Sequence, residues 1–356
     1  MPYIDQGAPV LVTGATGYVA GWIIKQLVEK GVHVHATIRD ISDRDHYAHL
    51  TKIGETGPGK IEFFEADLLQ PGSFAAAMEH CQLVFHTASP FRLNVKDPQT
   101  ELVDPALEGT RNVLNQATEG RSVRRVILTS SIAAIAGDNA DLENTDTGYF
   151  TEKNWNTTSS LTHQPYNYSK TLAEREAWKI AENQDRWRLV SINPALVIGP
   201  SLSGETGSES FRIIKSFADG SFEMGIPEYG ISLVDVREVA NAHCAAGYEH
   251  EAYGRYIVSA KNSNFTEVAK ILKDNFGERF RFPKRVLPKF LVWLAGPLVD
   301  PTLTRKAVSR NVGLPMRVEN GRSIQDLGVA YRPISDSLVE MFQQLVEAGK
   351  IRPVES

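Results

Sequence analysis

A tyrosine and a lysine four positions apart are the side chains best suited to chemistry in this sequence. Tyr166 and Lys170 open a helical pattern, so they lie one turn apart on a shared face. A phenol with a pKa of about 10 is a poor acid near neutrality, but a neighbouring ammonium lowers that pKa by stabilising the phenolate. We therefore expect Tyr166 to transfer a proton, although the same spacing also arises by chance, with a partly buried tyrosine beside a solvated lysine. The helix is expected to turn inward Ala173, Ala177, Ile180 and Ala181.

Hydroxyl groups follow the fifth strand-like run of the sequence. The apolar residues 126–128 precede Thr129, Ser130 and Ser131, and ligands of doubly wound sheets bind beyond the carboxyl ends of the strands. Neither serine lies in the Gly-x-Ser-x-Gly turn that presents a nucleophilic serine. We therefore expect Ser131 to donate a hydrogen bond to a substrate oxygen rather than to attack it.

A glycine-rich turn separates the first strand-like run, residues 10–12, from the first helical pattern. Gly14 permits a tight turn and Gly17 lets the backbone approach a pyrophosphate, while the start of the helix offers unpaired N–H groups to the anion. This position between a strand and an amphipathic helix favours a dinucleotide site over an ordinary tight turn. The residues of this turn that we expect to bind the dinucleotide are Thr13, Gly14, Thr16, Gly17, Tyr18 and Val19.

The charges after the second strand-like run predict which dinucleotide is bound. Folds that bind NAD place an acidic residue there for the ribose 2′-hydroxyl, whereas a cation accommodates a 2′-phosphate. The sequence has Arg39 there, with Arg44 close behind it, and a guanidinium pairs well with phosphate. Asp40 is the counter-evidence, because its carboxylate suits a hydroxyl group. We expect NADPH/NADP+ to be favoured over NAD(H).

Short apolar runs alternate with helical patterns along the first 200 residues. Such runs are typical of strands buried on both faces of a parallel sheet, so we expect an α/β fold with a doubly wound, Rossmann-type sheet. We expect residues 1–200, with 231–260, to form the NADP-binding domain, and residues 201–230 and 261–356 to form a smaller interleaved substrate-binding lobe. The runs lie at residues 10–12, 32–38, 61–64, 83–85, 126–128 and 189–192.

Two later segments carry expectations of their own. Residues 201–228 include a Ser/Gly-rich run with little apolar area, which predicts a mobile lid lined by Phe211, Phe222 and Met224. The apolar stretch 290–299 is too short to span a bilayer and is predicted to be a packed helix end.

Composition narrows the function classes. Apolar residues make up 42% of the 356 residues and charged residues 23%, as in ordinary globular proteins. A net charge of −5 argues against nucleic acid or an anionic membrane as a partner and favours a small molecule. Cys81 and Cys244 have no metal-ligand spacing, so we expect no disulfide framework and no metal site. The first residues carry no secretory pattern, which predicts a cytoplasmic location, and the oligomeric state, a homo-oligomer included, stays open.

Taken together, these motifs resemble the extended short-chain dehydrogenase/reductases of the NAD-dependent epimerase/dehydratase superfamily. The sequence is most similar to the dihydroflavonol-reductase-like group, which includes cinnamoyl-CoA reductases and yeast-type methylglyoxal or ketone reductases. The resemblance covers most of the chain and implies an NADPH-dependent reductase of aldehydes or ketones, or an alcohol dehydrogenase in reverse. Eight landmarks occur in the family's order: TGATGYVAGW, ATIRD, Asp67-Leu68, HTASPF, LTSSIAA, the Tyr166/Lys170 pair, INPALVIGP and VDVREVANAH.

The resemblance also implies residue roles. Ser131, Tyr166 and Lys170 would form a catalytic triad, with Lys170 also holding the nicotinamide ribose. Substrate contacts would come from Phe91, Ile132 and the loop after Pro200, where Phe222 is our candidate. Further cofactor contacts would come from Asp67, Leu68, Thr87, Ala88, Ser89, Thr129, Pro194, Ala195, Leu196 and Val197.

The sequence departs from the family's pattern at two places. Ala106 stands where many extended members carry an asparagine that counts as a fourth catalytic residue, so a water-borne proton relay through that position is not expected. Around Tyr166 the sequence has Gln-Pro-Tyr-Asn-Tyr instead of the Asn-Trp-Tyr-Cys-Tyr of cinnamoyl-CoA reductases, which disfavours thioester reduction. The alternatives are a nucleotide-sugar epimerase or dehydratase of the same fold, and a non-catalytic NADP(H)-sensing protein.

Overall fold

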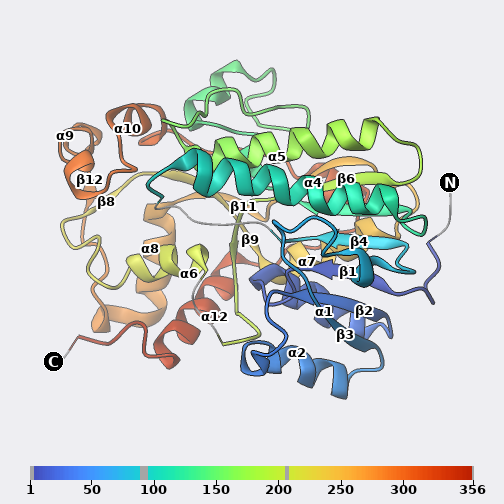
Figure 1. Cartoon of the computed structure of the whole chain (residues 1–356). Helices are drawn as coiled ribbons and strands as arrows, with labels where there is room; N and C mark the ends of the chain where they lie inside the picture. Colours follow the sequence, from blue (N-terminus) through green and yellow to red (C-terminus); the bar gives the residue numbers. More distant parts are fainter. Residues whose placement is uncertain (1–3, 89–94, 205–207, 355–356) are drawn as a thin grey trace.

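A seven-stranded parallel sheet forms the centre of the molecule (Figure 1). The computed structural model describes residues 4–88, 95–204 and 208–354. The strand order is β10-β6-β5-β4-β1-β2-β3, and every neighbouring pair is parallel. The expected Rossmann-type sheet is confirmed, since each of the six apolar runs forms a strand. The strands are β1 (Val10–Thr13), β2 (His33–Ile38), β3 (Lys60–Glu65), β4 (Leu83–His86), β5 (Arg125–Thr129), β6 (Arg188–Pro194) and β10 (Gly254–Val258).

Helices cover both faces of this sheet. In Figure 1, α4 and α5 run above the sheet, while α1 and α2 lie below it. After β3 the chain crosses over to place β4 on the other side of β1, which makes the ends of β1 and β4 the topological switch point where such sheets bind ligands. One face packs α1 (Tyr18–Glu29), α2 (Arg44–Thr56) and α7 (Val236–Tyr248), and the other packs α3 (Ala75–Met78), α4 (Asp104–Glu119) and α5 (Pro165–Glu182). A π-helical turn, Gln99–Val103, leads into α4, and 3-10 turns form at Ile132–Ala134 and Asn139–Asn144.

A second hydrophobic core lies beside the large sheet. Its small sheet has the order β11-β9-β7, with β9 parallel to β7 and antiparallel to β11. Within the range 231–260, β10 therefore joins the large sheet whereas β9 joins the small one. The strands are β7 (Leu196–Ile198), β9 (Gly230–Asp235) and β11 (Lys261–Asn264), with the separate pair β8 (Ile226–Pro227) and β12 (Val286–Leu287). The helices of this half are α6 (Glu209–Ser216), α8 (Phe265–Phe276), α9 (Lys289–Val299), α10 (Arg305–Asn311), α11 (Gly321–Gln325) and α12 (Ile334–Glu347), with a 3-10 turn at Gly277–Arg279.

Strand β3 differs from the expectation that the strands are buried on both faces. Glu62 and Glu65 are exposed and Ile61 is only half-buried. The strand is the edge of the sheet and has a partner on one side only. Charged side chains are common on such edges because they discourage pairing with another chain.

Two predictions about the second half are wrong. Helix α9 is not a packed helix end, since Phe290 is 67% exposed and Leu298 is 89% exposed, and only Val292 and Gly296 are buried. In the segment 201–228, Phe211 lies fully buried in the second core on α6, so it does not line a lid. Among the described residues, no helix combines the length and apolarity needed to cross a membrane.

Arg125 connects the sheet to the end of α7. Its side chain is buried at the start of β5, and one guanidinium nitrogen donates to the carbonyl oxygens of Ala246, Gly247 and Glu249 at 2.9, 3.0 and 2.6 Å. The last turn of α7 contains no basic residue of its own. The guanidinium therefore satisfies the carbonyl groups that every helix end leaves without partners.

Arg125→Met is expected to lower the free energy of unfolding by about 2–4 kcal/mol, because several buried carbonyl groups lose a charged donor at once. Urea unfolding followed by circular dichroism measures the change. Arg124→Met is the matched control, since Arg124 is exposed and immediately precedes β5. Equal effects of the two substitutions would contradict the capping role of Arg125.

Candidate functional site

The glycine-rich turn lies at the end of β1, next to the end of β4. Gly14 has a φ of +65°, and a Cβ atom at this position would lie 3.0 Å from the Cβ of Ala88. The positive φ and the close approach of the two segments both require glycine. The amide of Gly17 donates to the carbonyl oxygen of Gly14 at 2.9 Å and closes the turn.

Helix α1 begins directly after this turn and presents its first amides at the switch point. Its N-cap residue is Gly17, and no side chain of the described residues caps the helix. Uncapped amides and the positive end of the helix dipole together attract an anion. Thr16 and Val19 flank the cap, whereas the Tyr18 hydroxyl donates to the carbonyl oxygen of Gly199 at 2.5 Å. Tyr18 therefore offers a ligand its amide rather than its hydroxyl.

Thr13 is fully buried and connects the ends of β1 and β4. Its hydroxyl oxygen accepts hydrogen bonds from the amides of Thr87 and Ala88, each at 3.1 Å, and lies 3.0 Å from Nδ1 of His86. The Thr87 hydroxyl donates in turn to the Thr13 carbonyl oxygen. Burial, with repulsion from Lys170, lowers the pKa of His86 to about 3, so this ring is neutral. These contacts hold the two strand ends in a fixed relation.

Arg39 and Asp40, the cation and the carboxylate that follow β2, have different surroundings. Asp40 accepts hydrogen bonds from the amide and the hydroxyl of Ser42 at 2.8 and 2.6 Å, and these bonds lower its pKa. Arg39 is exposed, and its guanidinium makes no hydrogen bond or ion pair within the part of the chain that the structure describes. Arg44, also exposed, is the first residue of α2. Asp40 is thus engaged by its own turn, while the contact of Arg39 with a 2′-phosphate stays a prediction.

Asp67 and Leu68 follow β3 and differ in their surroundings. The exposed Asp67 carboxylate accepts from the amide of Leu69 at 2.8 Å. Leu68 packs against α4 at Gly109, where a Cβ atom would lie 2.4 Å from the Leu68 Cγ. The predicted cofactor contact Ser89 and the predicted substrate contact Phe91 lie outside the described residues.

Ser131, Tyr166 and Lys170 come from two neighbouring segments. Ser131 follows β5, and its oxygen accepts from the amide of Ala133 at 3.1 Å. The Ser131 hydroxyl also forms a hydrogen bond with Tyr166, which lies in the first turn of α5. Lys170 follows one turn later and is buried. The structure therefore brings Ser131 and Tyr166 into direct contact and places Lys170 on the same helix.

The protonation of Tyr166 differs from the expectation. Burial raises its pKa well above the usual 10.0, and the hydrogen bond with Ser131 offsets only part of this rise. Burial also lowers the pKa of Lys170 to about 8, although the negative charge of Glu174 acts in the opposite direction. The predicted lowering of the Tyr166 pKa is wrong, because removing a phenolate from water outweighs the stabilisation from its neighbours. Tyr166 is a protonated phenol at neutral pH.

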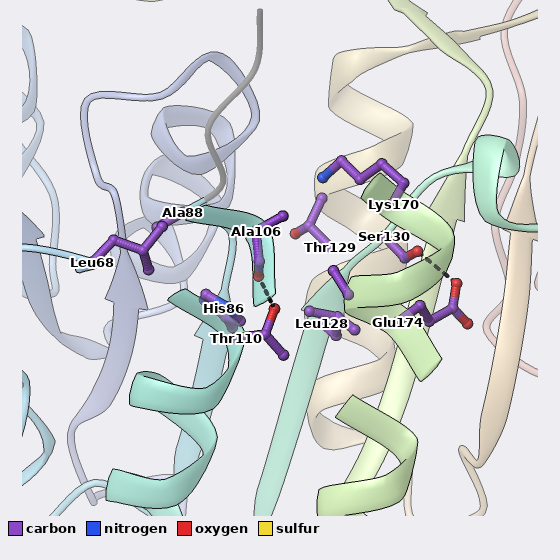
Figure 2. Close-up of a pocket in the computed structure, with 11 residues that line it drawn as sticks. Leu68, His86, Ala88, Ala106, Thr110, Leu128, Thr129, Ser130, Lys170 and Glu174 are labelled. Carbon is purple, nitrogen blue, oxygen red and sulfur yellow. Dashed lines mark hydrogen bonds between the residues drawn. The ribbon is translucent and has the colours of Figure 1, made fainter. Parts of the chain in front are cut away.

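A cavity lies between α4, α5 and the ends of β4 and β5 (Figure 2). Its lining includes Ala106, Thr129 and Lys170, and in Figure 2 the Lys170 side chain extends above Thr129. The Thr129 hydroxyl lies 2.7 Å from Nε2 of His243, whose Nδ1 lies 2.7 Å from the carbonyl oxygen of Val239. Nδ1 must therefore carry the proton, and the Thr129 hydroxyl donates to Nε2. Ala106 places a methyl group at this cavity, where the family's asparagine would carry an amide.

Glu174 is a buried charge that the sequence analysis missed. One carboxylate oxygen accepts from the Ser130 hydroxyl at 2.6 Å and from the Asn193 amide at 2.7 Å, and the other accepts from Arg255 at 2.6 Å. Helix α5 thus buries Lys170 and Glu174 with Ala177, whereas the expected inward residues Ala173, Ile180 and Ala181 are half-buried. The sequence signal for Glu174 was its position four residues after Lys170, which places both side chains on one face of the helix. Ser130 is thus held by Glu174, whereas the Ser131 hydroxyl contacts Tyr166.

A second buried carboxylate, Asp138, holds the loop before α5. It accepts hydrogen bonds from His163 at 2.9 Å, from Gln164 at 2.5 Å and from Arg310 at 2.5 Å. Gln164 is the N-cap residue of α5 and has a left-handed φ of 51°. Since Arg310 belongs to α10, the start of the helix that carries Tyr166 is tied to the second half of the molecule.

The remaining predicted contacts lie on either side of these groups. β6 ends at Pro194, the Ala195 amide donates to the carbonyl oxygen of Val258 at 3.0 Å, and β7 begins with Leu196 and Val197. Ile132 is half-buried directly after Ser131. The Phe222 ring packs in the second core. Its centroid lies 5.5 Å from the ring centroid of Phe217 and 6.1 Å from that of Phe265. Their contacts with cofactor or substrate stay predictions.

Comparison with known proteins gives similarity over most of the chain. Residues 10–259 match the NAD dependent epimerase/dehydratase family. Cinnamoyl-CoA reductase CAD2 of Medicago truncatula is 35% identical over 344 residues, 96% of each chain. An anthocyanidin reductase of Vitis vinifera is 35% identical over 277 residues, 74% of this chain and 80% of its own. The crystal structure of Gre2 from Candida albicans in complex with NADPH has a TM-score of 0.75 at 27% identity, covering 96% of this chain and 99% of its own.

Glu174→Gln is expected to lower the pKa of Lys170 below about 8, because the amide removes the negative charge that stabilises the ammonium. The free energy of unfolding should fall by about 3–5 kcal/mol, since Arg255 stays buried without its charge partner. The pKa is measured from the Lys170 13Cε chemical shift during a pH titration, and the stability by urea unfolding.

The matched control is Glu176→Gln on the same helix, because Glu176 pairs with the partly exposed Arg111 at 2.8 Å. This control should change neither quantity appreciably. An unchanged Lys170 titration in a folded Glu174→Gln variant would contradict the electrostatic role of Glu174.

Proposed function

The chain belongs to the NAD dependent epimerase/dehydratase family, and we propose that within it this protein is an NADPH-dependent carbonyl reductase with Ser131, Tyr166 and Lys170 as its catalytic residues. The resemblance to the extended dehydrogenase/reductases is confirmed by relatives that are named as reductases. The observation that carries the proposal is the hydrogen bond between Ser131 and a protonated Tyr166, one helical turn before Lys170.

The dinucleotide end of the site supports NADPH. Gly14 gives a close backbone turn and α1 an uncapped amino terminus, which together suit a pyrophosphate. Arg39 suits the 2′-phosphate, and Asp40 is turned toward Ser42 instead. The Gre2 structure similar to this chain is described as a complex with NADPH. When bound, the cofactor supplies the hydride for the carbonyl carbon.

The roles of the three catalytic side chains follow from their protonation. Tyr166 is protonated in the structure and donates its proton to the carbonyl oxygen as negative charge develops there. Ser131 donates a hydrogen bond to the same oxygen as negative charge develops there. Lys170, mostly protonated at pH 7, would stabilise the phenolate that Tyr166 leaves behind, and it would hold the nicotinamide ribose when the cofactor is bound. A protonated Tyr166 is the form that reduction of a carbonyl requires, while the equilibrium and the cofactor ratio set the direction of the reaction.

The substrate is a small aldehyde or ketone bound between the two halves of the chain. Residues 1–200 with 231–260, apart from β9 in the small sheet, bind the cofactor, and residues 201–230 and 261–356 form the substrate lobe. Ile132 and Phe222 are the candidate contacts of the substrate. NADPH oxidation against aromatic aldehydes, α-dicarbonyls, ketoesters, flavanonols and a cinnamoyl thioester tests this class. Slow turnover of the thioester is expected from the residues around Tyr166. Tight NADPH binding without turnover of any substrate would instead support a sensor, and tightly retained NAD an epimerase or dehydratase.

Tyr166→Phe is expected to lower turnover by roughly 10²- to 10⁴-fold with little change in NADPH affinity, because only the proton donor is removed. Steady-state rates at saturating substrate and fluorescence titration of NADPH measure the two effects. Tyr168→Phe, two residues later on the same helix, is the matched control and should retain activity. The opposite result for the two tyrosines would remove Tyr166 from the mechanism.

Arg39→Ala is expected to weaken NADPH binding by roughly ten- to a hundredfold while leaving NADH nearly unaffected, because a charge-assisted hydrogen bond is worth about 1.5–3 kcal/mol. Raising the salt concentration should reduce the preference of the wild type for NADPH over NADH, since salt screens an exposed charge pair. The measurement is kcat/KM for both cofactors in both proteins. A wild type that prefers NADH would refute the role assigned to Arg39.

A further inference from the structure

Two histidines and a glutamate meet on one face of the edge strands β2 and β3. His33 and His35 are two residues apart on β2, and Glu62 pairs with His35 across to β3, so all three side chains lie on the same face. A Glu62 carboxylate oxygen lies 3.5 Å from Nε2 of His33 and 4.0 Å from Nε2 of His35. Their ligating atoms all lie within 4.8 Å of one another. This is the tightest grouping of metal-binding side chains among the described residues.

The inner histidine is oriented as metal-binding histidines are. Nδ1 of His35 lies 2.8 Å from the carbonyl oxygen of Ala77, which can only accept, so Nδ1 carries the proton. Nε2 is then the ring nitrogen that lies on the side of Glu62, 4.0 Å from its carboxylate. Such a hydrogen bond from the second ring nitrogen to a carbonyl group is the usual support of a metal-ligating histidine. Cys81 lies 3.5 Å from Nδ1 on the far side of the ring and is not among the ligands.

We propose that His33, His35 and Glu62 bind one divalent transition-metal ion of the zinc class. Metal–ligand distances of about 2.0–2.2 Å in a tetrahedral site place the ligand atoms roughly 3.3–3.5 Å apart. The two separations from Glu62, 3.5 and 4.0 Å, approach this geometry, and the separation between the two histidines is within 4.8 Å. The partly exposed side chains of His33 and Glu62 can close the difference. Two imidazoles and one carboxylate suit zinc, and they leave the fourth position to solvent.

The site lies away from the proposed cofactor site. His33 opens β2, and Arg39 follows directly after its end, so the two are about 20 Å apart along the strand at about 3.3 Å per residue. A metal here bridges the edge strand β3 to β2 and should stabilise the folded chain, since it binds the folded state alone. The proposal therefore stands independently of the reductase activity.

The test is isothermal titration of Zn²⁺ into the full chain in a buffer without chelating groups, with Co²⁺ absorption as a second probe of tetrahedral coordination. We expect one ion per chain and a raised Tm. His33→Ala and Glu62→Gln should each weaken binding at least tenfold, as the loss of even a supporting residue costs ten- to a hundredfold. Both residues are partly exposed, so these variants are expected to fold.

The matched control is His80→Ala, because His80 is an exposed histidine beside Glu79, 3.6 Å away, without a third ligand in the described part of the chain. This variant should bind like the wild type, and NADPH affinity should be unchanged in all three variants. Absence of a saturable site in the wild type, or equal affinity in wild type, His33→Ala and Glu62→Gln, would overturn the proposal.

Discussion

The buried ion pair between Glu174 and Arg255 is the interaction on which the arrangement of the site depends. Moving a carboxylate and a guanidinium out of water costs several kcal/mol for each ion, so the pair persists only with near-complete hydrogen bonding. Glu174 meets this requirement through the Ser130 hydroxyl and the Asn193 amide as well as Arg255. Arg255 also donates to backbone carbonyl oxygens, including that of Asn154 at 2.5 Å. One carboxylate thereby joins α5 to β10, to β6 and to the end of β5.

This placement also sets the electrostatics around the proposed triad. Glu174 lies one helical turn beyond Lys170, and its charge supports an ammonium that burial would otherwise neutralise. The same carboxylate occupies Ser130 and so distinguishes it from the adjacent Ser131. The hydrogen bond with Ser131 offsets only part of the effect of burial on the pKa of Tyr166, which keeps its proton. The protonation of each of these buried groups therefore depends on the polar and charged groups around it.

Local sequence patterns predict most of the fold, but they predict only those features of the site that depend on residues close together in the sequence. The six apolar runs and the helices that begin after the glycine-rich turn and at Tyr166 were found because their spacing depends on neighbouring residues alone. The partner of β9, the exposure of α9 and the burial of Glu174 depend on segments far apart in sequence, which periodicity does not encode. The wrong direction for the Tyr166 pKa has the same origin, since burial is a property of the assembled fold. The spacing of Tyr166 and Lys170 was visible because one helical turn links them.

The two halves of the chain are coupled through the helix that begins at the glycine-rich turn. Tyr18 and Trp22 of α1 donate to the carbonyl oxygens of Gly199 and Pro200, at 2.5 and 2.9 Å, where the chain leaves the first half. Gly199 has a φ of +109°, and a Cβ atom there would lie 2.7 Å from the Asp235 carboxylate, so this junction requires glycine. Asp235 caps α7 and pairs with Arg237 at 2.7 Å. In the proposed reaction a hydride and a proton reach the same carbonyl group from different elements. This junction fixes helix α1 against the segment that leads into the proposed substrate lobe.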